Sequence, residues 1–417
     1  MSAPHGHVLV ARLDSVGDIL LSGPAVRAVA ASASKVTMLV GRGRSAVARL
    51  LPGVDDVLEF DAPWVVPEPG PLDAVAIDAL VAAMRAARVD AALVVTSFHQ
   101  SPLPLALLLR LAGVGWIGAI SDDYPGSLLD LRHRLPEIPE NPERQRGDLT
   151  GGRGGSSPHT TDLENPERQR GDLSGGRGGS SPHTTQDPPE SERALDLARA
   201  AGFELAGPAT LAVRHPLPDV ADLVGEGPYV VYHPGADAPA RRPGPEQSRA
   251  LVAALVAAGH RVVVTGSSAE ADLTGVVADG LARDLTGLVD LAGLAAVLEG
   301  AEVVVAPNTG PAHLAAAVGT PVVSLFAPVV PSARWAPYGV PVVLLGDQDA
   351  PCRLTRARHC PVPGHPCLDG IAPDAVVAAV ATLLQSRSQS RSQSRSPFPA
   401  PSAGTPPARP REVDHAR

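Results

Sequence analysis

Short apolar runs alternate with Ala- and Leu-rich segments along the first part of the chain. The runs at 8–11, 36–40 and 91–95 are rich in Val and Leu and have the length of buried strands. Segments 19–31, 45–51 and 103–111 have the length and composition of helices. Strands that alternate with helices through short turns predict a parallel, doubly wound sheet.

The same pattern returns in the second part of the chain. We expect strands at 229–233, 261–265, 302–306 and 321–326, and helices at 245–259, 269–281, 294–298 and 373–384. A connection at about 205–228, interrupted by Pro216 and Pro218, separates the two halves. The chain therefore predicts an α/β protein with two doubly wound, Rossmann-like domains that face each other across a cleft.

Two segments do not have the composition of a packed domain. Segment 140–189 contains one tandem repeat with an offset of 24 residues, rich in Gly, Ser, Pro and Arg, and too poor in apolar residues to form a core. Segment 385–417 begins with three copies of Gln-Ser-Arg-Ser and continues as Pro-rich sequence. We expect a disordered insertion and a disordered tail. The predicted domains are then 1–139 plus 190–213, and 214–384.

Charge and length narrow the possible functions. The formal net charge is −9, which gives no electrostatic support to nucleic-acid binding. No apolar run has the length of a membrane span, and the N-terminus does not have the pattern of a signal peptide. We expect a cytoplasmic protein with at most peripheral membrane association.

The three cysteines of the chain lie close together near its C-terminal end. Cys352, Cys360 and Cys367 fall within sixteen residues, with His359 and His365 among them. Zinc ligands normally come in pairs two to four residues apart, and neither cysteine gap has that spacing. Reduced thiols in a loop are therefore the favoured interpretation, with a metal site as the alternative.

The turn at 307–313 carries the clearest chemical signal. It reads Pro-Asn-Thr-Gly-Pro-Ala-His, directly after the strand at 302–306 and before an Ala-rich helix. The first turn of such a helix has backbone N–H groups without intrahelical partners, directed at the space above the sheet. This turn, with Thr309 and Gly310 at the helix start, is predicted to hold a phosphate. His313 can contact that phosphate or can simply hydrogen-bond the local turn.

A second glycine-containing turn follows the first strand. Residues 12–18 read Arg-Leu-Asp-Ser-Val-Gly-Asp, and ligands of doubly wound sheets bind where strands end. Gly17 permits close approach of the backbone. Asp18 is interpreted either as a helix N-cap or as a carboxylate that accepts a proton from a substrate hydroxyl.

Three further residues are candidates for donor binding in the second half. Arg241 follows the strand and glycine turn at 232–236 and can contact a diphosphate, although it can equally be solvated. Ser268 and Glu270 follow Thr265-Gly266, where they can hold a ribose hydroxyl; helix capping by Ser268 explains them nearly as well.

A dinucleotide site is not supported. Segment 41–46, Gly-Arg-Gly-Arg-Ser-Ala, resembles a dinucleotide fingerprint but follows the second strand, and no acidic residue closes the next strand at the expected distance. We expect no nicotinamide cofactor.

Taken together, these turns resemble the heptosyltransferases that use ADP-heptose, glycosyltransferase family 9. The resemblance rests on the Arg-Leu-x-Ser-x-Gly-Asp core at 12–18, His-Pro-Gly at 233–235, Thr-Gly at 265–266 and the segment 309–321. It covers about 330 residues, everything outside the insertion and the tail.

The resemblance implies a GT-B fold, an inverting transfer without metal or other cofactor, and two partners. These are a nucleotide-sugar donor, ADP-heptose above all, bound by the C-terminal domain, and a glycan or lipid-linked acceptor bound by the N-terminal domain. It implies that Asp18 is the catalytic base, that Ser15 and Gly17 lie on the acceptor side, and that Arg241 and the turn at 308–313 bind the donor diphosphate.

Two positions depart from the family pattern. Asn308 stands where the family usually has Asp, which removes a negative charge beside the donor. Arg241 stands where the family has Lys, which keeps the charge but changes its geometry. Two other functions stay open: a GT-B epimerase or hydrolase acting on nucleotide sugars, and a non-catalytic nucleotide-sugar-binding protein.

Overall fold

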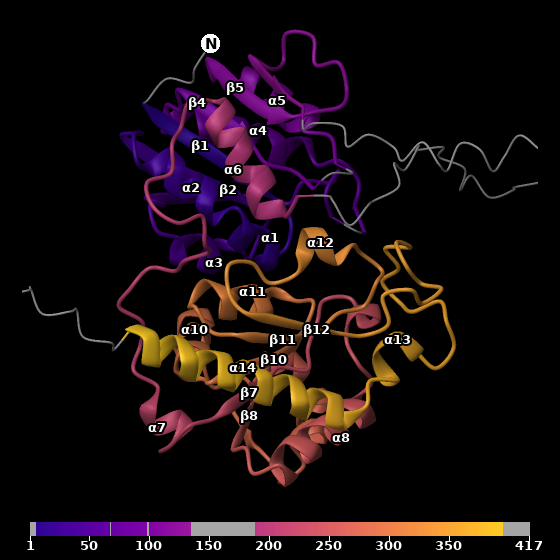
Figure 1. The fold of residues 1–417 in the computed structure, drawn as a ribbon. Helices are drawn as coiled ribbons and strands as arrows, with labels where there is room; N and C mark the ends of the chain where they lie inside the picture. Colours follow the sequence, from indigo (N-terminus) through magenta and orange to yellow (C-terminus); the bar gives the residue numbers. More distant parts are fainter. Residues whose placement is uncertain (1–5, 67, 98–99, 135–187, 395–417) are drawn as a thin grey trace, which may run out of the picture.

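The computed structural model describes residues 6–66, 68–97, 100–134 and 188–394. These residues form two domains, each built around one parallel sheet, and the N-terminal domain lies above the C-terminal domain in Figure 1. The insertion predicted at 140–189 lies outside the described residues except for its last two. The tail predicted at 385–417 lies outside them from residue 395 onward.

The N-terminal sheet has six parallel strands in the order β3-β2-β1-β4-β5-β6. Its strands are β1 (His7–Arg12), β2 (Lys35–Val40), β3 (Asp56–Glu59), β4 (Ala91–Val94), β5 (Trp116–Ile120) and β6 (Leu131–His133). Its helices are α1 (Val16–Leu21), α2 (Gly23–Ala30), α3 (Ser45–Leu50), α4 (Ala74–Ala87), α5 (Leu103–Leu111) and α6 (Glu190–Ala200). The strand order reverses between β1 and β4, so this is the switch point where α/β sheets bind ligands.

The C-terminal sheet repeats this topology in the order β12-β11-β10-β7-β8-β9. Its strands are β7 (Val230–Tyr232), β8 (Val262–Val264), β9 (Arg283–Asp284), β10 (Val303–Pro307), β11 (Val322–Leu325) and β12 (Val342–Leu345). Its switch point lies between β7 and β10. The predicted phosphate turn follows β10 directly.

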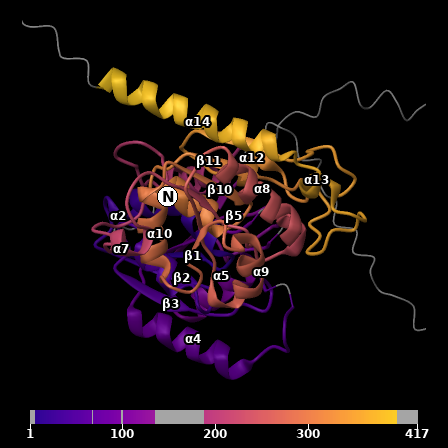
Figure 2. The ribbon, with the colours of Figure 1, turned by 90° about the horizontal axis from the view of Figure 1, so that it is seen from below.

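Helices of two kinds accompany this sheet. The α-helices are α7 (Ala221–Val224), α8 (Pro245–Ala257), α9 (Ala271–Ala278), α10 (Leu291–Gly300), α11 (Gly310–Ala317), α12 (Ser332–Trp335), α13 (Pro366–Asp369) and α14 (Pro373–Ser394). Two 3₁₀ turns, η2 (Pro239–Arg241) and η3 (Ser268–Glu270), follow β7 and β8. Figure 2 shows α14 along one side of the molecule and α4 at the opposite end.

The apolar core has three parts. One cluster lies between the N-terminal sheet and α4 and α5, and another between the C-terminal sheet and α8, α9 and α14. The largest cluster contains residues of both domains, from α1, α2, α3 and α6 on one side and α10 and α11 on the other. The domains face one another and meet directly through α1 and α11 (Figure 1).

Two expected helix boundaries need correction. The helix predicted at 19–31 is two helices, because Pro24 has no N–H to continue the ladder and the Ser22 hydroxyl donates back to the Ile19 carbonyl (2.7 Å). The helix predicted to end at 384 continues to Ser394. Arg387 supports this extension by donating to the carbonyls of Ala301 and Glu302 (2.9 and 2.8 Å).

Several short elements have no clear sequence pattern. The edge strands β3 and β6 are half-exposed, so they do not show the apolar run of a buried strand. Helix α6 follows the repeat segment and packs against α2. The division of the chain at residue 213 stays a prediction. None of the helices in the described part of the chain combines the length and hydropathy that a membrane span needs.

Candidate active site

The two predicted turns lie at the switch points of their sheets and meet at the domain boundary. The β1–α1 turn is taken here as residues 12–18, from the end of β1 into the first turn of α1. The β10–α11 turn is taken as residues 307–313, from the end of β10 into the first turn of α11. A Cβ atom built on Gly17 would stand 2.6 Å from Cδ2 of His313, and one on Gly310 would stand 2.9 Å from Cγ1 of Val16. The absence of a side chain at both glycines therefore lets the first turn of α1 contact the first turn of α11.

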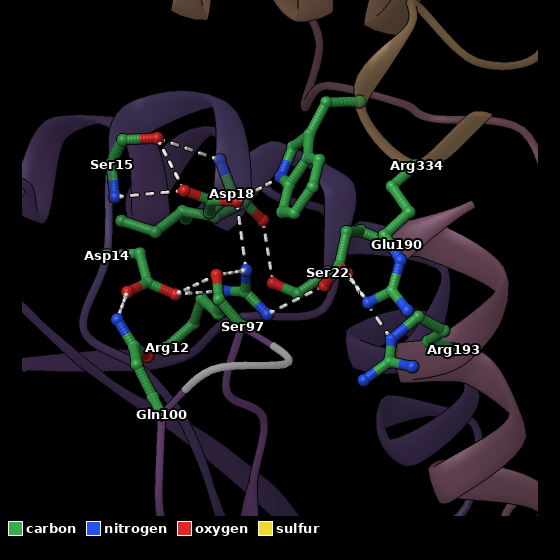
Figure 3. Close-up of polar contacts among 12 residues, drawn as sticks. Arg12, Asp14, Ser15, Asp18, Ser22, Ser97, Gln100, Glu190, Arg193 and Arg334 are labelled. Carbon is green, nitrogen blue, oxygen red and sulfur yellow. Dashed lines mark hydrogen bonds and ion pairs between the residues drawn. The ribbon is translucent and has the colours of Figure 1, made fainter. Parts of the chain in front are cut away.

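Arg12, the last residue of β1, lies at the centre of the N-terminal half of the site (Figure 3). Its side chain is 1% exposed and forms ion pairs with Asp14 (2.9 Å), Asp18 (2.9 Å) and Glu190 (3.6 Å). It also donates to the Ser97 hydroxyl (3.0 Å). Three carboxylates raise the pKa of Arg12 above its usual value although burial opposes the charge, so the guanidinium is permanently charged.

Asp14 is held on the other side of Arg12. Its carboxylate accepts from the Ser97 hydroxyl (3.2 Å) and from Nε2 of Gln100 (2.5 Å). Burial raises the pKa of Asp14, and the nearby charge of Asp18 adds to this, while Arg12 lowers it. Arg12 and its neighbours thus anchor the β1–α1 turn to the loop after β4.

Asp18 is the third residue of α1 and is not its N-cap. The N-cap is Ser15, and the two residues form a capping box in which Asp18 N–H donates to Ser15 Oγ (3.3 Å). Ser15 in turn donates to Oδ2 of Asp18 through its hydroxyl (2.7 Å) and its backbone N–H (3.3 Å). Oδ1 of Asp18 accepts from Nη2 of Arg12 (2.9 Å) and from Nε1 of Trp335 (3.2 Å).

These contacts decide the ionisation of Asp18. Burial works to raise its pKa, but the Arg12 charge and the hydrogen bonds from Ser15 and Trp335 outweigh burial and hold the pKa below its usual range. Asp18 is therefore an ionised carboxylate at neutral pH.

Glu190, at the start of α6, extends the cluster toward the C-terminal domain. Its side chain is 1% exposed and pairs with Arg12, Arg193 (3.3 Å) and Arg334 (3.5 Å). Burial raises the pKa of Glu190, and the neighbouring arginines lower it. The cluster thus contains three carboxylates (Asp14, Asp18 and Glu190) and three guanidinium groups (Arg12, Arg193 and Arg334).

The β10–α11 turn differs from the β1–α1 turn because some of its buried polar atoms are not hydrogen-bonded within the described residues. Nδ2 of Asn308 and Nδ1 of His313 are buried and have no hydrogen-bond partner among the described residues. Thr309 is the N-cap of α11, and its side chain makes no capping hydrogen bond. Burial lowers the pKa of His313 to about 4, so the imidazole is neutral at neutral pH and has one N–H to donate. This turn can satisfy its polar atoms with a ligand that carries oxygen acceptors, such as a phosphate or a sugar.

Arg241 ends the 3₁₀ turn η2 on the C-terminal side of the junction. Its Nε is buried without a hydrogen-bond partner among the described residues. Burial lowers the pKa of Arg241, and the charges of Asp18 and Asp237 oppose this shift. Asp18, His313 and Arg241 thus lie close enough to influence one another electrostatically.

Ser268 and Glu270 lie on the turn after β8, next to the turn after β7. Glu270 forms a capping box with Ser267 (2.8 Å), so the cap is Ser267 and not Ser268. A Cβ on Gly235 would stand 1.8 Å from Oε1 of Glu270, which therefore lies directly over the glycine turn of β7. Ser268 is exposed, and its role in donor binding stays a prediction.

The cysteines form a small thiol cluster in the C-terminal domain. Sγ of Cys352 lies 3.8 Å from Sγ of Cys367, and burial raises the pKa of Cys367 to about 12. Across the described ranges, no group of three or more His, Cys, Asp or Glu residues has an arrangement suited to a metal ion.

Two residues that complete the site carry no sequence signal of their own. Glu190 and Trp335 reach Arg12 and Asp18 from distant parts of the chain, Trp335 across 317 residues. Arg12 does carry a general one, since a charged residue that ends a fully apolar strand is either exposed or paired.

Sequence comparisons place the clearest similarity in the C-terminal half. Residues 183–365 match the model of glycosyltransferase family 9 (heptosyltransferase). Lipopolysaccharide heptosyltransferase 1 of Pseudomonas aeruginosa is 34% identical over 162 residues, which is 36% of this chain and 45% of that protein. The chain thus spans about half the length of this curated relative.

Structural comparisons cover both domains. The glycosyltransferase family 9 protein of Veillonella parvula matches with a TM-score of 0.66 at 14% identity, over 93% of this chain and 99% of that one. E. coli ADP-heptose lps heptosyltransferase II matches at 0.63 and 18% identity, over 92% and 99%. E. coli heptosyltransferase WaaC with ADP matches at 0.59 and 19% identity, over 90% and 99%. At these identities the matches show the fold, which is of the GT-B type.

The sequence match over residues 183–365 and the fold match over both domains confirm the resemblance of this chain to glycosyltransferase family 9.

Proposed function

We propose that this protein is an inverting, metal-independent glycosyltransferase that transfers heptose from ADP-heptose to a hydroxyl of a glycan or glycolipid. The observation that carries the proposal is the position of Asp18. It is an ionised carboxylate of the N-terminal domain, 14% exposed, in the helix that touches the predicted phosphate turn of the other domain.

The nature of the donor is supported from two sides. WaaC of E. coli was solved with ADP and with ADP-2-deoxy-2-fluoro heptose. In this chain, the unpartnered Nδ2 of Asn308, Nδ1 of His313 and Nε of Arg241 are groups that a nucleotide sugar can satisfy. Backbone N–H groups at the start of α11 and the positive charge of Arg241 favour the diphosphate.

The proposed reaction is a single displacement. The acceptor oxygen attacks the anomeric carbon while its proton passes to Asp18, and the bond from that carbon to the diphosphate oxygen breaks. ADP leaves with the electron pair, and Arg241 offsets the charge that develops on it. One displacement inverts the anomeric configuration. The acceptor is expected on the side of Ser15 and Gly17.

The variant Asp18→Asn tests this role. It keeps the shape of the side chain but cannot take up the proton, so we expect the transfer rate to fall by about 10²–10⁴-fold. ADP affinity, measured by calorimetry, should stay within a few-fold of the wild type. Asp61→Asn, at an exposed carboxylate of the same domain, is the matched control. Full turnover by Asp18→Asn would contradict the base assignment.

A thermal-shift screen with ADP, UDP and GDP sugars tests the donor. We expect ADP-heptose to stabilise the wild type and Arg241→Ala to lose most of that stabilisation. Turnover of the donor without any acceptor, beyond slow hydrolysis, would indicate an epimerase or hydrolase. Binding without turnover under every acceptor would indicate a binding protein.

A further inference from the structure

The segment from α12 to Tyr338 forms a row of polar contacts across the domain boundary. Trp335 donates from its indole to Oδ1 of Asp18 (3.2 Å), and the hydroxyl of Tyr338 donates to Oε1 of Glu192 (2.9 Å). Arg334 pairs with Glu190 (3.5 Å). This segment belongs to the C-terminal domain, whereas all three acceptors belong to the N-terminal domain.

Hydrogen bonding at Asp18 is complete in this arrangement. An ionised carboxylate has about four lone-pair positions. Both positions on Oδ2 are taken by Ser15, and those on Oδ1 are taken by Arg12 and Trp335. A general base must accept a hydrogen bond from the hydroxyl that it deprotonates, so one of these donors has to leave first.

We propose that Trp335 is a positioning residue whose indole N–H occupies the place of the acceptor hydroxyl on Asp18, and that acceptor binding requires its withdrawal. The proposal rests on the proposed function, because it takes Asp18 as the base.

The other two residues that donate hydrogen bonds to Asp18, Ser15 and Arg12, cannot give way to an acceptor hydroxyl as easily. Ser15 caps α1, and losing that cap costs about 1 kcal/mol. Arg12 is 1% exposed and neutralises three carboxylates, so removing it would leave buried charges unpaired. Trp335 alone among the four contacts comes from the opposite domain, on a helix of four residues. A small displacement of the domains or of α12 is enough to break its contact.

The exchange of Trp335 for the acceptor hydroxyl also explains how the nucleotide sugar can be protected from hydrolysis by water. While the indole occupies Asp18, a water molecule cannot place its O–H on the carboxylate. Activated water would attack the anomeric carbon, give its proton to Asp18 and release free sugar and ADP. Trp335 therefore restricts base catalysis to molecules that displace it, which an acceptor bound by several contacts does better than water.

The test compares the wild type with Trp335→Phe, which keeps an aromatic ring but removes the N–H donor. The first readout is the pKa of Asp18, followed by ¹³C NMR of aspartate-labelled protein and assigned with Asp18→Asn. The second is ADP release without acceptor, from the nucleotide sugar that gives the largest thermal shift. We expect the Asp18 pKa to rise in the variant and ADP release to increase several-fold.

Two further variants make the result specific. Trp64→Phe changes a tryptophan that packs on Phe60 and should leave both readouts unchanged. Arg334→Gln keeps Trp335 but weakens the attachment of α12 to Glu190, so it should change both readouts in the same direction as Trp335→Phe, by less. It also provides the test should Trp335→Phe not fold.

Each remaining outcome is decisive. An unchanged Asp18 pKa would show that Trp335 does not hold the carboxylate. A raised pKa without faster ADP release would show that Trp335 holds the carboxylate but does not occupy the acceptor's place. Either result overturns the proposal. If Asp18→Asn still transfers sugar, the proposed base fails, and the NMR titration still reports whether Trp335 contacts Asp18.

Discussion

The two turns that meet at the domain boundary both connect a buried strand to a helix, but they differ in how far their polar side chains are hydrogen-bonded within the protein. In the β1–α1 turn, Asp18 accepts four hydrogen bonds and Arg12 pairs with three carboxylates. In the β10–α11 turn, Asn308 and His313 each have a buried nitrogen without a partner among the described residues. The polar groups of the first turn are satisfied by protein contacts, whereas those of the second turn leave buried nitrogens to which we assign a ligand under the proposed function.

This difference is informative because both turns follow a strand at a switch point and begin a helix. Satisfied polar groups rigidify a site and fix its charge, which suits a residue that must stay ionised. Unsatisfied buried groups lower stability, and a site retains them where a ligand repays the cost. We expect that removing the partnered groups of the first turn lowers stability at neutral pH, whereas removing the buried nitrogens of the second turn at neutral pH mainly lowers ligand affinity.

The largest effect is expected at Arg12. Arg12→Gln leaves Asp14, Asp18 and Glu190 without the guanidinium between them, and breaking a buried pair of this kind costs about 3–5 kcal/mol. Urea unfolding measures this cost. Arg42→Gln, which removes the ion pair with Asp61 at a 73% exposed side chain, should cost at most about 1 kcal/mol. Equal costs would contradict the central role of Arg12.

The second effect concerns His313 and pH. Its pKa is about 4 in the folded protein and about 6.5 when unfolded, so the unfolded chain binds the proton first. This contribution to stability is fully present above pH 6.5 and is lost as pH falls toward 4, by about 3 kcal/mol. Urea unfolding at pH 7 and pH 4.5 should show a smaller loss for His313→Gln than for the wild type. Parallel losses would mean that the histidine is not buried as a neutral ring.

The smallest effects form a matched pair across the two turns. Ser15→Ala removes the N-cap of α1 and should lower the free energy of unfolding by about 1 kcal/mol, with ADP-heptose affinity unchanged. Asn308→Ala removes an amide whose Nδ2 has no partner among the described residues, so it should change stability less and lower ADP-heptose affinity about tenfold. Calorimetry and urea unfolding together separate the two. Unchanged donor affinity in Asn308→Ala would remove this residue from the donor site.

Much of the fold could be predicted from the chain alone. Buried parallel strands such as β1, β4 and β10 are continuous apolar runs, and the helices between them are bounded by Gly and Pro. Edge strands such as β3 could not be predicted, because a short, half-exposed strand does not show the continuous apolar run of a buried strand. The break between α1 and α2 could not be predicted from hydrophobic periodicity, because it depends on Pro24, which has no N–H, and on the hydrogen bond from the Ser22 hydroxyl to the Ile19 carbonyl.

The candidate site divides in the same way. Local sequence alone determined the two strand-to-helix turns and the carboxylate at Asp18, and it predicts phosphate binding by residues 307–313, because a glycine turn between a buried strand and a helix acts through its own backbone. Only the tertiary structure decided which distant groups join Arg12 and Ser15 around Asp18. Glu190 and Trp335 reach the cluster from outside the first domain's continuous sequence, and Gly17 meets His313 across the domain boundary. Such contacts depend on how whole domains pack, and packing is set by shape and burial summed over many residues, which no short pattern contains.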